Sequence, residues 1–245
     1  MKNGREFLKG ASSLKYDLSQ TDASKGIAVP DFEKPVKPGQ KVIPLLKKKE
    51  WKNIPKVDLA SAIENRRSER VFLKKALSLE ELSFLLWATQ GVVRKGEGYT
   101  MRTVPSAGAR HAFETYLCVL NVAALKQGVY RYLPVRHQLA EEFLDEQLAA
   151  KIIPACMGQQ FATTAAVVFA WAVIPYRMEW RYGPVSYKAI ALDAGHVCQN
   201  LYLACEAVGC GTCAVAAYNQ ELMDKLLVLD GQDEFTLYLA PVGKA

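Results

Sequence analysis

The sequence predicts an α+β fold in which a mostly antiparallel sheet is flanked by helices. Helical and strand-like segments follow one another in a mixed order, whereas a doubly wound parallel sheet requires a helix between successive strands. Half of the 245 residues are apolar, which allows one large domain to bury a sizeable core without disulfides. No internal repeat interrupts this pattern.

The helices are predicted from apolar spacing and from residues that start or end a helix. A short helix ends near Asn65, and a capping box of Ser78 and Glu81 starts a second helix. Residues 191–208 are apolar almost all round, so this long helix should run through the centre of the domain. Two further helices are predicted over 145–156 and 219–229.

The strands are predicted from runs of β-branched and aromatic residues. Residues 113–122 and 128–133 are separated by a short turn and form an antiparallel pair. Residues 165–174 are predicted to be a strand buried on both faces, and 235–242 a final strand. The Gly-rich, charged residues 92–104 are predicted to form a mobile loop.

The first 56 residues are predicted to be an extended arm, followed by one domain over 57–245. Five of the eleven prolines lie in this stretch, which excludes a regular helix or a central strand. Such an arm lies over its own domain or over a neighbouring subunit.

Charge and composition limit which partners and which cellular compartment can be expected for this protein. The net charge is +6, but the 31 basic residues are scattered, which argues against nucleic acid. Lys47–Lys49, next to Trp51, is interpreted as a solvated face. No secretory signal is visible, and the longest apolar run is too short to span a bilayer. The six cysteines lack the spacing of a disulfide scaffold, so they are predicted to be reduced in a cytoplasmic protein.

An arginine cluster is the first candidate site. Arg66, Ser68 and Arg70 alternate, so in an extended chain their side chains share one side, while Arg67 lies on the other. Guanidinium groups bind phosphate oxygens bidentately, and a hydroxyl adds a neutral donor. The alternative is a helix end with ordinary surface arginines.

A turn of small residues is the second candidate site. Pro105, Ser106, Ala107 and Gly108 would let a flat ring approach the main chain, with the serine or backbone amides bonding its edge. The same residue types also form ordinary turns.

Residues 209–214 match the glycine fingerprint of dinucleotide-binding folds in letters only, because they follow a helix and not a strand. Cys205, Cys210 and Cys213 have the spacing of a plant-type iron-sulfur protein. No cysteine follows to complete the set, so buried thiols are preferred over a metal site. His196 and the other two histidines show no metal-binding spacing, and His196 is interpreted as a core residue.

Four motifs in this order resemble the FMN-dependent nitroreductase superfamily, and its SagB/ThcOx-type dehydrogenase branch in particular. They are Arg66–Phe72, Pro105–His111, Leu192–Leu201 and Gly209–Thr212. The resemblance implies a nitroreductase-like fold and a homodimer with swapped extensions that binds FMN between its subunits. It also implies electron transfer from NAD(P)H or another donor to a small-molecule acceptor.

The resemblance further implies which residues contact FMN. The phosphate and ribityl chain would be held by the arginine cluster and the ring by the small-residue turn of the other subunit. The chain after the glycines would reach the reactive edge through backbone amides. The cofactor-binding residues expected on this basis are Arg66, Arg67, Ser68, Arg70, Pro105, Ser106, Ala107, Gly108, Gly211, Thr212, Ala216, Ala217 and Lys244.

Substrate contacts are expected from Arg181 and Tyr182, which stand where azoline-oxidising relatives carry a Lys-Tyr pair. Arginine stays protonated and cannot act as a base, which argues against azoline oxidation. The alternatives left open are a flavin-binding protein or sensor without turnover and, behind it, a cysteine-cluster metal protein.

Overall fold

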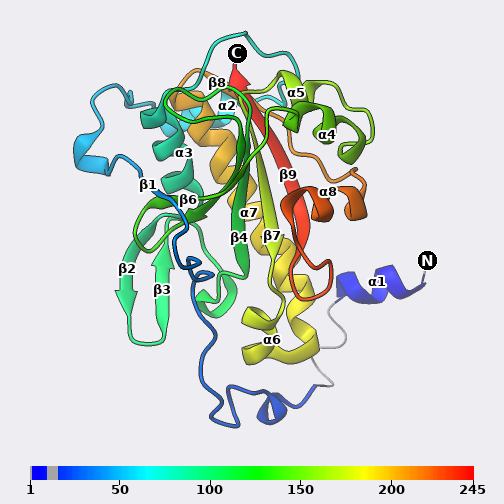
Figure 1. Ribbon diagram of the computed structural model, residues 1–245. Coiled ribbons are helices and arrows are strands. Elements are labelled where there is room, and N and C mark those ends of the chain that lie inside the picture. Colours follow the sequence, from blue (N-terminus) through cyan, green and yellow to red (C-terminus); the bar gives the residue numbers. More distant parts are fainter. Residues whose placement is uncertain (1, 10–15) are drawn as a thin grey trace.

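A seven-stranded sheet forms the centre of the computed structural model, which describes residues 2–9 and 16–245 (Figure 1). Its order is β1-β6-β5-β4-β7-β9-β8, and all neighbouring strands are antiparallel. The strands are β1 (Val42–Pro44), β4 (Phe113–Val119), β5 (Gly128–Leu133), β6 (Gln138–Leu144), β7 (Val167–Val173), β8 (Cys210–Thr212) and β9 (Phe235–Lys244). The α+β fold with a mostly antiparallel sheet is therefore confirmed.

Helices cover both faces of this sheet (Figure 1). Side chains of β7 alternate between two cores: Phe169 and Trp171 join the core beneath α3 and α7, whereas Val168 and Ala170 join the core beneath α4 and α8. Burial on both faces explains why β7 is apolar without interruption. The helices are α1 (Lys2–Lys9), α2 (Leu59–Asn65), α3 (Leu79–Gln90), α4 (Leu148–Ala155), α5 (Phe161–Thr164), α6 (Tyr176–Tyr182), α7 (Ser186–Ala207) and α8 (Gln220–Leu227).

The helix ends follow the signals in the sequence. The Ser78 hydroxyl accepts a hydrogen bond from the Glu81 N–H, and the Glu81 carboxylate accepts one from the Ser78 N–H, so the predicted capping box is present. Asn219 caps α8 in the same way, by accepting from the Leu222 N–H. These bonds satisfy backbone donors that the first turn of a helix leaves free.

Several elements differ from the prediction, and β1, β8 and α6 lie where the sequence predicted no strand or helix. Residues 92–104 contain a two-stranded hairpin, β2 (Val92–Gly96) and β3 (Tyr99–Arg102), where a mobile loop was expected. The helix expected from residue 191 begins at Ser186. Strand β6 was not predicted, because its two adjacent acidic residues break the apolar pattern; their carboxylates contact Lys41 and Arg131.

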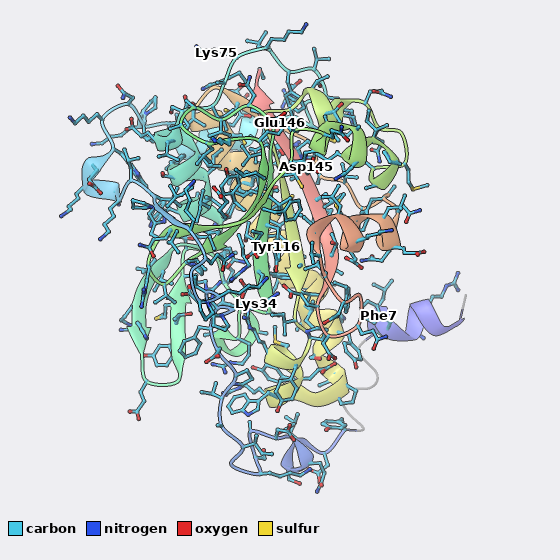
Figure 2. All side chains as sticks on the ribbon, viewed as in Figure 1. Phe7, Lys34, Lys75, Tyr116, Asp145 and Glu146 are labelled. Atoms are coloured by element: carbon cyan, nitrogen blue, oxygen red, sulfur yellow. The ribbon has the colours of Figure 1, made fainter. Side chains whose placement is uncertain are left out.

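The N-terminal arm crosses the sheet and contributes β1 to its edge (Figure 1). Lys34 lies beside Tyr116 of β4 and donates a hydrogen bond of 3.1 Å to its hydroxyl (Figure 2). The expectation that the arm contains no regular helix is wrong at its start, because α1 occupies Lys2–Lys9, before the first proline. Short helical turns also occur at Leu18–Gln20 and Lys48–Glu50. Residue 1 and residues 10–15 of the predicted arm lie outside the described residues.

None of the helices within residues 2–9 and 16–245 combines the length and the apolar character needed to cross a membrane.

Candidate functional site

The arginine cluster follows α2 and lies against β8. Ser68 forms an isolated parallel bridge with Thr212, and the Glu69 N–H donates to the Thr212 carbonyl over 2.9 Å. The backbone is therefore extended at this point, so alternate side chains face the same way. Ser68 and Arg70 are exposed and Arg66 is half-buried, which leaves their polar groups open to a ligand.

Tyr202 of α7 organises this cluster. Its hydroxyl lies 3.0 Å from the Ser68 Oγ and accepts a hydrogen bond of 2.8 Å from the Ala214 N–H. Because the amide can only donate, the tyrosine can give its own proton to Ser68, which leaves the serine proton for an external acceptor. The guanidinium of Arg66 lies 5.3 Å from the centre of the same ring. One side chain thus holds two of the predicted phosphate ligands.

The remaining arginines of the cluster differ from one another. Arg67 turns back and donates to the carbonyls of Glu64 and Arg66 over 2.7 and 2.9 Å. Arg70 lies 6.0 Å from the ring centre of Phe161 in α5. Within the described chain, neither arginine forms an ion pair with a carboxylate. Arg67 therefore stabilises the end of α2, and Arg70 has an open guanidinium.

Gly211 and Thr212 pack directly behind the cluster. A Cβ at Gly211 would lie 2.5 Å from the Cβ of Glu69, so only glycine allows this approach. The Thr212 hydroxyl is buried and donates to the Pro241 carbonyl over 2.8 Å. Both residues therefore support the cluster, the glycine through its backbone and the threonine through a bond to β9.

The chain after β8 returns to the surface at Ala216 and Ala217. Val215 exchanges two backbone hydrogen bonds with Leu239, and the Ala217 carbonyl accepts from the Gln159 side chain. Both alanines are exposed, and their N–H groups have no hydrogen-bond partner in the described part of the chain. These amides can donate to a ligand.

The small-residue turn is held by hydrogen bonds at its corners. The Ser106 Oγ accepts from the His111 N–H over 2.9 Å, and the Ala109 N–H donates to the Ser106 carbonyl over 3.0 Å. Gly108, Ala109 and His111 all have positive φ angles of 58°, 53° and 47°. Two of these are not glycine, so the turn stores backbone strain of the kind found at ligand-binding sites.

Asp193 of α7 lies behind this turn. Its carboxylate accepts from the Ala107 N–H over 3.3 Å, and His196 Nδ1 lies 3.9 Å away. Burial raises the pKa of the Asp193 carboxyl, against the opposing effect of its bonds to Ser106 and Ala107. His196, interpreted from the sequence as a core residue, is instead half exposed, with its side chain 50% accessible.

Arg181 and Tyr182 lie against Gly108. A Cβ at Gly108 would come within 2.5 Å of the Tyr182 hydroxyl and 2.9 Å of the Arg181 Cδ. The structure therefore brings the expected substrate-side residues to the expected ring-side turn. Arg110 joins them, because its guanidinium lies over the Trp180 ring at 5.2 Å and Nε donates to the Gly108 carbonyl over 3.0 Å.

Lys244 lies in β9 and is buried. Its ammonium group donates to the Glu81 carboxylate and to the Val208 carbonyl, the second over 2.6 Å. Two of its three donors are thus engaged inside the protein. The ammonium group that was expected near the phosphate ties β9 to α3 and to the end of α7.

His111 and the six cysteines are buried in an environment that disfavours their charged forms. Burial, followed by the charge of Arg102, lowers the pKa of His111 to about 3, so this ring stays neutral. All six cysteines are free and buried, and burial raises the pKa of Cys198 to about 12. Among the residues described, no cluster of His, Cys, Asp or Glu could hold a metal ion.

The two candidate sites do not meet within one chain. Asp193 marks the turn and Tyr202 marks the arginine cluster, nine positions apart on α7. That separation corresponds to about 14 Å along the helix and to opposite sides of it.

Sequence reasoning left Tyr202, Asp193 and Arg110 without roles. Each of them stands inside or next to a quoted motif, and Tyr202 and Asp193 are buried polar residues on a mostly apolar helix. Buried polar groups need partners, which is the signal that could have identified them. The partners themselves lie up to 134 positions away.

The chain resembles known proteins over most of its length. A profile described as "Nitroreductase family" matches residues 63–244. The "Putative nitroreductase MJ1384" of Methanocaldococcus jannaschii is 35% identical over 193 residues, which cover 78% of this chain and 93% of that protein.

Solved structures share the fold. A "putative nitroreductase" from Ralstonia eutropha superposes with a TM-score of 0.69 and 26% identity, over 89% of this chain and 92% of its own. A "putative nitroreductase in complex with fmn" from Desulfovibrio desulfuricans superposes with a TM-score of 0.52 and 15% identity, over 77% and 87%. At that identity the second likeness concerns the fold alone.

Proposed function

The chain belongs to the Nitroreductase family, and we propose that it is an FMN-dependent oxidoreductase. It would take electrons from a reduced donor such as NAD(P)H and pass them to a small organic acceptor. Bound FMN would supply this redox chemistry by being reduced and reoxidised, while the protein binds, orients and shields the reactants.

One observation carries this proposal. Arg66 lies over the Tyr202 ring whose hydroxyl contacts Ser68, and Arg70 follows two positions later on the same extended stretch. Neither guanidinium has a carboxylate partner among residues 2–9 and 16–245. Arginines gathered without an acid are suited to an external anion, and their planar forks match phosphate. The fit to FMN is chemical as well, because Tyr202 leaves the serine proton available to a phosphate oxygen.

The other two groups of residues fit a flat ring. Arg181 and Tyr182 fill the space where a Cβ of Gly108 would lie, so the glycine lets these two side chains pack directly against the turn that would face the ring. The open amides of Ala216 and Ala217 provide fixed donors for carbonyl oxygens or ring nitrogens at its edge. These donors would hold charge on the ring without moving a proton.

A homodimer is part of the proposal, because it would bring one copy's turn to the other copy's arginines. Exposed apolar side chains support it: Leu59 and Ile63 on α2 and Leu192 on α7 are 64%, 57% and 56% exposed. Leu59 also lines an apolar groove of about 540 Å³, together with Val57, Trp87, Leu203 and others. An exposed apolar groove of this kind is typical of an interaction site.

Arg181 and Tyr182 would contact the acceptor from the side of the turn. Arginine stays protonated and can hold a negative charge but cannot remove a proton. This favours acceptor reduction over azoline oxidation of the SagB type. The six free, buried cysteines support a reducing compartment, so a cytoplasmic location is proposed as well.

The purified protein tests this function directly. We expect a yellow preparation that releases about one FMN per chain, contains little iron or zinc, and is bleached by NADH or NADPH and recoloured by a nitroarene or quinone. A colourless protein that refuses FMN would contradict the proposal. A bound flavin that no donor bleaches and no acceptor reoxidises would favour the non-catalytic flavin-binding alternative.

A further inference from the structure

The N-terminal arm contacts the sheet and α6 at two separate places. Near residues 32–35 it is pinned by buried charges of the sheet. The Lys34 N–H donates to the Glu114 carboxylate over 2.8 Å, and Arg131 donates to the carbonyls of Lys34 and Pro35 over 2.8 and 3.0 Å. Arg102 donates to the Phe32 carbonyl over 2.6 Å. This attachment fixes where the preceding residues of the arm can reach.

The preceding residues of the arm, 16–27, hold α6. The Ala23 N–H donates to the Trp180 carbonyl over 2.8 Å, and the Trp180 indole N–H donates to the Ile27 carbonyl over 2.9 Å. The Tyr176 hydroxyl donates to the Asp22 carboxylate over 2.8 Å. Figure 1 shows this part of the arm passing below α6, and we call it the α6 clamp.

Helix α6 depends on tertiary contacts: Arg177 pairs with the buried Glu114 and Met178 is buried in the core, while the clamp holds Tyr176, Trp180 and Gly183. The helix has seven residues, and helices of this size are marginal without tertiary contacts. Gly183 ends it with a φ of 55°, and Tyr16 of the clamp occupies the space where a Cβ would lie, at 2.5 Å. The clamp therefore touches α6 near both of its ends.

Helix α6 also packs against the small-residue turn at Gly108. Arg181 and Tyr182 occupy the space beside Gly108, and Arg110 connects Trp180 to the hairpin by donating to the Gly98 carbonyl over 3.0 Å. A shift of α6 would move all of these groups together. The clamp therefore contacts α6, and α6 contacts the turn at Gly108.

We infer that Asp22 and Ala23 are positioning residues that fix α6, and with it Arg181 and Tyr182, over the substrate side of the flavin pocket. The inference rests on the proposed function. Within the described residues, no hydrogen bond or ion pair joins the clamp to the turn or to the arginine cluster, so the clamp acts through α6. It determines the space left for an acceptor, not the binding of the cofactor.

Two substitutions in the 245-residue chain weaken the clamp. Asp22→Ala removes the acceptor of the Tyr176 hydroxyl, and Ala23→Pro removes the N–H that bonds the Trp180 carbonyl. Asp22→Asn keeps an acceptor oxygen and should behave as the parent. Lys25→Ala is the control, because Lys25 lies on the same segment, is exposed, and its loss changes the net charge by one unit, in the opposite direction to Asp22→Ala.

Hydrogen exchange measures the position of α6 without any need for flavin. Losing one hydrogen bond corresponds to about a fivefold change in an opening equilibrium, so amides of residues 176–182 should exchange about fivefold faster in either clamp variant. Amides of α3 and of the second half of α7 should be unchanged. Unchanged exchange in residues 176–182 would overturn the inference, whether or not the protein binds FMN.

Steady-state kinetics separates positioning from a general loss of stability. In the clamp variants we expect KM for a nitroarene acceptor to rise about fivefold or more, with kcat, FMN content and melting temperature close to those of Lys25→Ala. Asp22→Asn should restore KM. Equal KM values in Asp22→Ala, Ala23→Pro and the parent would overturn the inference, whereas a parent protein without FMN would overturn the proposed function only.

Discussion

The chain contains two groups of arginines that differ in burial and in partners. Arg131 and Arg177 lie beneath the arm, with side chains 2% and 5% exposed, and both contact the carboxylate of Glu114. Arg66 and Arg70 lie at the surface next to β8 and contact aromatic rings. A buried carboxylate neutralises the charges of the first pair, whereas the second pair has no carboxylate partner in the part of the chain described.

This difference separates structural arginines from ligand-binding ones. A buried guanidinium requires a partner, because removing a charge from water costs several kcal/mol. A surface guanidinium needs no partner and contributes little to stability on its own. Substitutions in the two groups should therefore have opposite effects, on folding in one case and on cofactor binding in the other.

The largest effect is expected from the double substitution Arg66→Ala with Arg70→Ala. Each charge-assisted bond to phosphate contributes about 1.5–3 kcal/mol, so FMN affinity should fall at least about 100-fold. The melting temperature should stay within a few degrees of the parent, because no buried pair is broken. FMN content after gel filtration and quenching of FMN fluorescence measure this.

A matched control for that experiment is Lys49→Ala with Arg136→Ala, which removes two exposed cations elsewhere on the surface. It should retain FMN. If the double arginine variant retains as much FMN as this control, Arg66 and Arg70 are not the phosphate ligands.

Glu114→Ala should have the opposite effect, a loss of stability without a loss of FMN binding. Removing the carboxylate leaves Arg131 and Arg177 buried and unpaired, which costs about 3–5 kcal/mol of unfolding free energy. FMN affinity of the folded protein should change less than about twofold. Urea unfolding followed by circular dichroism measures the loss, with the exposed Glu97→Ala as control. A stable Glu114→Ala protein that loses FMN would remove the distinction between the two groups.

The same variant has a predictable pH dependence. Burial alone would raise the pKa of Glu114, but the charges of Arg177 and Arg131 outweigh it and hold the pKa below its ordinary value of 4.5. A carboxyl whose pKa is depressed in the folded state stabilises fully above its unfolded pKa and loses that contribution as the pH falls. The stability difference between the parent and Glu114→Ala should therefore be constant near pH 7 and shrink below about pH 4.5.

Local signals allowed much of the fold to be predicted. The capping box at Ser78 fixed the start of α3, and the uninterrupted apolar run in β7 identified a strand buried on both faces. Elements whose stability depends on distant partners were missed. Strand β6 carries Glu141 and Glu142, which are paired by Lys41 and Arg131, and α6 is short and held by the arm.

The candidate site divides in the same way. The arginine cluster and the small-residue turn are contiguous in sequence and could be proposed from their residue types. Tyr202 could not be assigned a role, because the distance between its hydroxyl and Ser68 depends on how α7 packs against β8. Contacts between side chains more than a hundred residues apart in the sequence depend on how the elements pack. The spacing of residues within one element contains no information about them.

A moderate effect is expected from Tyr202→Phe, which keeps the ring beneath Arg66 and removes the hydroxyl between Ser68 and Ala214. The loss of a shared hydrogen bond, about 1 kcal/mol, should weaken FMN binding about fivefold. Riboflavin lacks the phosphate, so its affinity should not change. Tyr130→Phe removes a hydroxyl bonded to the Lys126 carbonyl and serves as control. Equal losses for FMN and riboflavin would place Tyr202 outside the phosphate site.

The smallest effect is expected from Arg67→Ala, and it decides whether the arginine cluster acts by contact or by net charge. Arg66, Arg67 and Arg70 are close in sequence, so each contributes to the electrostatic field that a nearby phosphate experiences, within a screening length of about 8–10 Å. If this field alone bound the phosphate, the loss of any one arginine would lower FMN affinity by almost the same factor. Arg67, however, donates to the carbonyls of Glu64 and Arg66 at the end of α2. If contact decides, Arg67→Ala should change FMN affinity less than about twofold and lower stability by about 0.5 kcal/mol, whereas Arg66→Ala alone should cost about tenfold or more in affinity. Equal affinities of the two single variants, measured by FMN fluorescence at low and at high salt, would show that charge alone is sufficient.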